Sequence, residues 1–163
     1  MNKLLIILII LVIVLYVRFN LKYSPNYEIL QIYPSQITPE LLNEKNPIVI
    51  ETIEDKNIGD LITSALKYLY LYKLEYMYQP KELPVKNNAK YVFITTKSQN
   101  SDIEIINPKY KQSENYKSVS VKLNPKQVLI LPSYWRFKCD NNLNCVYVHD
   151  LFSSFYQTFA TIL

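Results

Sequence analysis

The side chains with the clearest chemical potential lie close together near the C-terminus: Cys139, Cys145, His149 and Asp150. Thiolate, imidazole and carboxylate are the ligand types that Zn²⁺ takes in proteins. However, zinc-binding cysteines are usually separated by about two to four residues, and strand alternation directs Asp150 away from the others. His149 is the only histidine of the chain. We therefore expect no metal site, no cofactor and no catalytic residue.

Residues 135–139 and 145–149 predict the two arms of a hairpin around a polar loop. This pairing sets Cys139 opposite Cys145, so a cross-strand disulfide is predicted, with a reduced pair equally open because the compartment is unknown. Arg136 and His149 are the polar groups that could line a pocket here. The alternative for His149 is a core histidine bonded to a backbone carbonyl.

Composition excludes several classes of enzyme. Gly59 is the only glycine among 163 residues, so neither a glycine-rich phosphate loop nor a G-x-S-x-G nucleophile elbow can exist. Apolar residues make up 49% of the chain and charged residues 20%, which is typical of a globular protein. The pattern after the first twenty or so residues is continuous and predicts one domain, residues 23–163.

The N-terminus contains an unbroken apolar run, Leu4 to Val17, between Lys3 and Arg18. Such a run, with flanking side chains that reach outward, is long enough for most of a bilayer core. No small residue precedes Ser24, so the cleavage site of a secretory signal is missing. We predict an uncleaved, single-pass transmembrane anchor over residues 1–22 that contacts lipid through residues 3–19. A removed signal peptide is the alternative.

Helical signals dominate the first half of the domain. Thr38 followed by Pro39 predicts the start of a short helix, and residues 48–53 predict a strand. Asp60 then predicts the cap of a longer helix through residues 61–78, although the end of that segment also alternates like a strand.

Tyrosines are unusually frequent around this predicted helix, and some should be exposed. Exposed aromatic side chains are enriched where proteins meet partners. They predict an interaction surface, with coverage by loops as the alternative, and its residues are Tyr68, Tyr70, Tyr72, Tyr76 and Tyr78.

The second half of the chain reads as β structure. Strands are predicted at residues 91–96, 102–106, 118–123 and 128–131, before the two arms of the hairpin. A final helix is predicted from Asp150 onward. Several short strands at regular spacing, flanked by helices, indicate a mainly β fold of the sandwich or jelly-roll barrel type.

The segment "VLILPSYWRFKC" resembles the strand-Pro-x-x-Trp-x-His segment of the Jumonji-type cupins, and "ITPELLNEKNPIVIETI" resembles the segment that opens their domain. Pro132 and Trp135 match the family pattern. The resemblance implies a cupin-like double-stranded β-helix. It also implies a missing catalytic site, because the family's iron-binding histidine falls at Phe137, and a phenyl ring cannot bind iron.

The membrane segment and the Lys/Asn/Tyr-rich composition are similar to those of cupin-like proteins of large double-stranded DNA viruses. This resemblance implies a virion membrane or host endomembrane location and a coat or membrane protein as partner. Lysines between the middle strands indicate a solvated face, so no nucleic acid is expected.

Together these features predict a non-enzymatic, membrane-anchored cupin-like protein that acts as a structural or tethering module. A small-ligand or glycan-binding module is the alternative. An iron dioxygenase relative that works through a non-standard site is the third reading.

Overall fold

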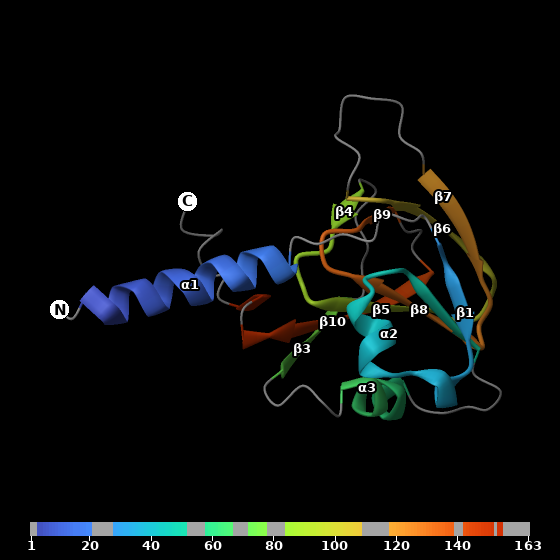
Figure 1. The fold of residues 1–163 in the computed structure, drawn as a ribbon. Helices are drawn as coiled ribbons and strands as arrows, with labels where there is room; N and C mark the ends of the chain where they lie inside the picture. The colour runs from blue at the N-terminus through green and yellow to red at the C-terminus, as the bar shows by residue number, and fades with distance from the viewer. Residues whose placement is uncertain are drawn as a thin grey trace.

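The computed structural model describes residues 3–20, 28–51, 58–66, 72–77, 84–108, 118–138, 142–151 and 153–154. Helix α1 (Lys3–Asn20) projects from one side of a β domain (Figure 1). Within these residues, none of the helices combines the length and the apolar composition that crossing a bilayer requires.

Two sheets form the β domain, and all strand pairs but one are antiparallel; β1 and β2 pair in parallel. The six-stranded sheet has the order β1 (Leu30–Ile32), β2 (Ile48–Glu51), β8 (Gln127–Pro132), β5 (Tyr91–Thr96), β10 (Leu143–Asp150) and β3 (Tyr72–Met77). The four-stranded sheet has the order β4 (Val85–Lys86), β9 (Arg136–Lys138), β6 (Ser101–Ile106) and β7 (Ser118–Leu123).

The six-stranded sheet is buried on both faces. One face packs against the four-stranded sheet, where residues such as Ile94, Ile105 and Leu129 form a shared core. The other face forms a second core with helices α2 (Pro39–Asn43) and α3 (Ile58–Leu66), to which Leu42 and Leu61 contribute. Both helices lie on this face in Figure 1, and the short helix η1 (Pro34–Gln36) precedes them. The expectation of a mainly β fold of the sandwich type, flanked by helices, is confirmed.

Two predicted helix starts are confirmed. The Leu41 backbone N–H donates to Oγ1 of Thr38 at 3.2 Å, with Pro39 at the first helical position. The Ser153 backbone N–H donates to Oδ1 of Asp150 at 2.8 Å. These bonds satisfy backbone donors that a helix start leaves without a partner. Residues 155–163, which would continue the final helix, lie outside the described part of the chain.

The prediction of one helix through residues 61–78 is wrong. Helix α3 ends at Leu66, and residues 72–77 form strand β3. The alternation of this segment decides the outcome, because pairing with β10 places Leu74 against the outer core. Of the predicted tyrosine surface, Tyr72 and Tyr76 lie on this strand, and Tyr76 is 54% exposed. Tyr68, Tyr70 and Tyr78 lie outside the described residues.

The predicted hairpin of residues 135–139 and 145–149 is also wrong. Strand β9 pairs with β4 and β6, whereas β10 pairs with β5 and β3 in the other sheet. Strand β10 carries apolar side chains on both faces, so it fits only the sheet that is covered on both sides. The described parts of the two arms therefore lack the pairing on which the prediction of Cys139 opposite Cys145 depends. Cys145 is a buried free cysteine, and Cys139 lies outside the described residues.

Candidate functional site

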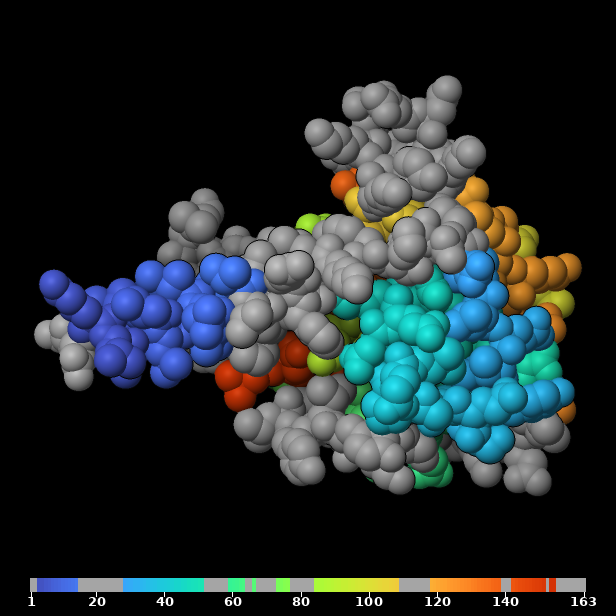
Figure 2. Space-filling view, viewed as in Figure 1, coloured from blue at the N-terminus to red at the C-terminus, as the bar shows by residue number. Residues whose placement is uncertain are grey.

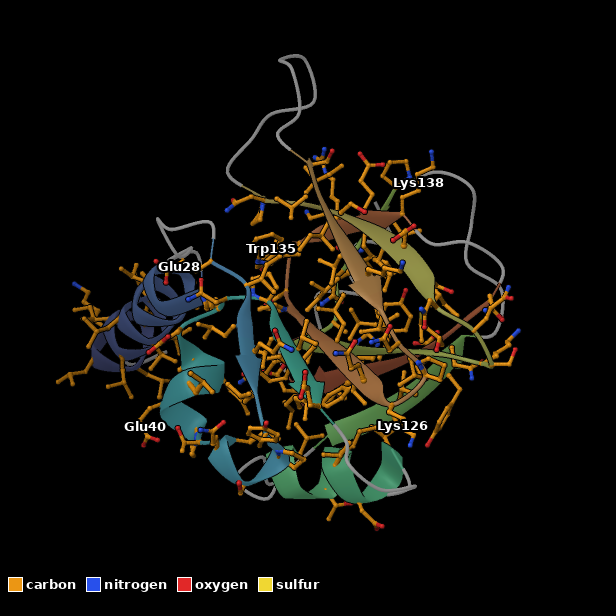
Figure 3. All side chains as sticks on the ribbon, turned by 90° about the vertical axis from the view of Figure 1, so that its right-hand side faces the viewer. Glu28, Glu40, Lys126, Trp135 and Lys138 are labelled. Carbon is orange, nitrogen blue, oxygen red and sulfur yellow. The ribbon has the colours of Figure 1, made fainter. Side chains whose placement is uncertain are left out.

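Residues 132–135, called here the Pro-Trp corner, link β8 to β9 and thereby connect the two sheets. Trp135 lies inside the sandwich, whereas Lys126 and Lys138 lie on the outer surface (Figure 3). Phe137, at the position that would hold a metal ligand in the resembled family, is only 2% exposed and packs in the core between the sheets. The corner therefore contributes an apolar side chain at this position.

The side chain of Asn87 holds the corner in place. Asn87 is completely buried, and its Nδ2 donates to the carbonyl oxygens of Leu131 at 3.0 Å and Pro132 at 2.9 Å. Its Oδ1 accepts from the Ala89 backbone N–H at 3.0 Å. One amide side chain thus makes hydrogen bonds with three backbone groups in the interior of the domain.

The backbone of Asn87 also makes hydrogen bonds with the corner. Its N–H donates to the Trp135 carbonyl at 2.8 Å, and its carbonyl accepts from the Tyr134 N–H at 2.7 Å. Tyr134 has φ of 71°, a left-handed conformation that costs energy for a residue with a Cβ atom. The indole N–H of Trp135 donates to the Lys45 carbonyl at 3.3 Å. These contacts assign the corner a structural role: it fixes the turn from one sheet into the other.

The polar side chains with chemical potential lie instead around His149 on β10. His149 is 4% exposed, and its Nε2 lies 3.3 Å from Oε2 of Glu75 on β3. This carboxylate is the polar partner of Nε2, whereas Nδ1 has no hydrogen-bond partner among the described residues, so the carbonyl bond that a structural histidine normally makes is not seen there. The ring stacks on Tyr147, with centroids 6.5 Å apart. The arrangement is a buried proton acceptor beside a carboxylate.

Burial lowers the pKa of His149, because desolvation disfavours the imidazolium ion. The negative charges of Glu75 and Asp150 raise this pKa, and the positive charge of Lys73 lowers it further. The Asp150 carboxylate lies 3.4 Å from Nζ of Lys90. At neutral pH the imidazole is therefore uncharged and can both donate and accept a hydrogen bond.

Sequence reasoning identified His149 but missed Glu75. The sequence predicts a helix at Glu75. In the structure Glu75 lies on a strand instead, and pairing of this strand with β10 brings its side chain close to His149. The alternation of residues 72–77 was the signal that could have found it. Arg136, the second predicted pocket residue, lies on β9 in the other sheet, where it pairs with Lys86 and Ile106. The structure therefore does not pair Arg136 with His149 across strands.

Comparisons with known proteins give only distant likenesses. No family model matches the chain, and no curated protein shows a significant match. Among solved structures, the chain is similar to vicilin from Corylus avellana (hazelnut), with 18% identity over 52% of this chain and 24% of that chain, at a TM-score of 0.35. It is also similar to the WlaRB TDP-quinovose 3,4-ketoisomerase from Campylobacter jejuni, with 17% identity over 48% of this chain and 62% of that chain, at a TM-score of 0.31.

These likenesses correct one expectation. The prediction that the protein is not an enzyme is contradicted, because several of the similar structures are sugar-nucleotide enzymes, including a second 3,4-ketoisomerase from Helicobacter canadensis. The chain spans less than two thirds of the length of these structures, and TM-scores near 0.3 assign no reaction to it. The described residues include no cluster of three His, Cys, Asp or Glu side chains that could hold a metal.

The lowered pKa of His149 gives a prediction about stability. The folded-state pKa lies below the ordinary value of about 6.5, so the unfolded chain binds more protons between the two values. We expect the free energy of unfolding to fall as the pH drops below about 6.5 toward the folded-state pKa, measured by urea unfolding from neutral to mildly acidic pH. His149 is the only histidine, so His149→Gln should flatten this part of the profile. Equal slopes for both proteins would contradict the assignment.

Proposed function

We propose that the protein is a cupin-like β domain held at a lipid bilayer by helix α1. The observation that carries this proposal is the exposure of the helix: every residue from Leu4 to Val14 is a large aliphatic residue that is 38 to 75% exposed. Contiguous apolar surface of this kind on a folded protein normally marks a site of contact with a membrane or partner.

The distribution of these side chains favours lipid over a protein groove. A helix that docks on a protein or lies flat in an interface is apolar along one stripe, whereas α1 is apolar all round between Leu4 and Val14. The helix also projects from the β domain (Figures 1 and 2). Burial in acyl chains would remove this apolar surface from water, and each Å² buried would stabilise the attached state by about 25 cal/mol.

Flotation of the full-length protein with liposomes tests the proposal. The natural protein is expected to float, and the variant Leu8→Glu/Leu11→Glu should stay in the dense fraction, because each charge in a bilayer core costs about 3 kcal/mol on insertion scales. Tyr33→Glu, which changes an exposed residue of the β domain, is the matched control and should float. Failure of the natural protein to float, or flotation of the double variant, would contradict attachment through α1.

The state of His149 supports a second role, binding of a small polar ligand or glycan at the end of β10. A buried imidazole whose Nδ1 has no partner among the described residues, together with the carboxylate of Glu75, offers hydrogen-bonding groups to the hydroxyls of a ligand. Titration of the ¹³C-labelled histidine with a panel of oligosaccharides tests this role. Ring shifts that saturate and disappear in Glu75→Gln are expected; an unchanged ring signal would argue against it.

The resemblance to cupin-like proteins of large DNA viruses supports a proposal about location. The setting would be a virion membrane or a host endomembrane, and the partner a coat or membrane protein. Cross-linking and mass spectrometry in the native membrane test it. Reproducible links to one coat or membrane protein are expected, and links confined to this chain would contradict it.

A further inference from the structure

Strand β3 is the outermost strand at one end of the six-stranded sheet among the described strands. Its six residues pair with β10 on one side, and none of the described strands pairs with its other side, where backbone groups can pair with a further strand. Leu74 packs against the outer core and thereby holds the strand in place. Lys73 and Tyr76 are exposed, and the Glu75 side chain is 42% exposed.

The sequence of this edge is complementary to itself. Residues 72–76 read Tyr-Lys-Leu-Glu-Tyr, with opposite charges placed symmetrically about Leu74. If a second copy of β3 pairs antiparallel with Leu74 at the centre, Lys73 of each copy lies opposite Glu75 of the other. The same register sets position 72 opposite Tyr76. All charged positions of the edge are then paired with opposite charges.

Other registers of the same pairing are disfavoured. Centring on Lys73 sets two lysines opposite each other, and centring on Glu75 sets two glutamates opposite each other, which is destabilising across strands. A slip by one residue places Leu74 opposite Glu75 and turns the helix-covered face of one copy to the opposite side of the joint sheet. Among these registers, the one centred on Leu74 pairs opposite charges and keeps the helix-covered faces of both copies on the same side of the joint sheet.

We infer that the protein forms a two-fold symmetric homodimer through antiparallel pairing of its β3 edges. The two six-stranded sheets join into one continuous sheet, and the exposed Tyr76 of each copy becomes covered at the joint. This dimer involves only the β domain, so a test of the dimer does not depend on whether α1 attaches the protein to a bilayer.

Charge reversal tests the dimer in the full-length protein in mild detergent, with molar mass measured by light scattering across a concentration series. Lys73→Glu and Glu75→Lys are each expected to raise the dimer dissociation constant at least about tenfold, since each turns two attractive pairs into repulsive ones. The combined variant Lys73→Glu/Glu75→Lys restores both pairs with reversed sign and should return to within about threefold of the natural protein.

Two controls locate the interface. Lys122→Glu changes an exposed lysine on β7, an edge of the other sheet, and should leave the dissociation constant unchanged. Leu74→Cys in a Cys139→Ser background should form a covalent dimer on mild oxidation, because the symmetry brings the two cysteines face to face, whereas Lys122→Cys should not. Lys73→Glu keeps the Glu75 side chain that contacts His149, and because Lys73 lies opposite His149, the variant His149→Gln, which should leave the dissociation constant unchanged, separates the dimer from that contact.

Three results would overturn the inference: a monomer at every concentration, a dimer that is insensitive to Lys73→Glu, or a double variant that fails to recover although circular dichroism shows it folded.

Discussion

Replacing Asn87 with alanine is expected to lower the free energy of unfolding by about 3 kcal/mol, because three buried hydrogen bonds worth about 1 kcal/mol each are lost. The carbonyls of Leu131 and Pro132 and the N–H of Ala89 would remain buried without these partners. Urea unfolding of the full chain in mild detergent measures the change. Trp135 is the only tryptophan and lies in the corner, so its fluorescence reports directly on this region.

Two further variants sharpen the Asn87 experiment. Asn88→Ala changes the exposed neighbour and should cost less than about 0.5 kcal/mol. Asn87→Asp keeps an acceptor for Ala89 but sets a carboxylate oxygen against two carbonyl oxygens, so it should be at least as destabilising as Asn87→Ala. If Asn87→Ala were as mild as Asn88→Ala, the corner would not depend on this side chain.

Replacing Phe137 with histidine, which restores the residue type of the resembled family, is expected to destabilise the fold by about 3 kcal/mol at neutral pH. The substitution removes apolar surface from a filled core and buries two ring nitrogens among apolar side chains. Because a buried histidine is disfavoured when charged, the loss should grow as the pH falls below about 6.5. The same unfolding assay measures it.

Tyr33→His is the matched control for Phe137→His, since Tyr33 is 49% exposed and a histidine there should be tolerated. A Phe137→His protein as stable as this control would show that the core between the sheets can hold a polar ring. Stabilisation of Phe137→His by added Fe²⁺ or Zn²⁺ would show that hidden ligands converge on this position.

The sequence was sufficient for most strands because their signals are local. Residues 118–123 alternate strictly, and residues 91–96 form a short apolar run between polar loops, so both strands appear at the predicted positions. The cap at Thr38 was equally predictable, since a hydroxyl residue followed by proline satisfies the needs of a helix start within a few residues.

The errors concern which segments meet. Residues 135–139 and 145–149 are close enough in sequence to form a hairpin, yet β9 and β10 belong to different sheets. The apolar side chains on both faces of residues 143–148 indicate a doubly covered strand, but the sequence alone does not show which strands and helices supply that cover. The same limit applies to the site: His149 was recognised as the lone histidine, but its contact with Glu75 depends on the partner that residues 72–77 find.

The hydrogen bonds of the Pro-Trp corner have a consequence for the folding rate of the domain. Asn87 meets Leu131 and Pro132 across 44 and 45 residues of chain, and Trp135 meets Lys45 across 90. Closing such long loops costs chain entropy before any of these bonds forms, and proteins dominated by distant contacts fold slowly for this reason. We therefore expect the corner to close late in folding, with burial of Trp135 among the last events.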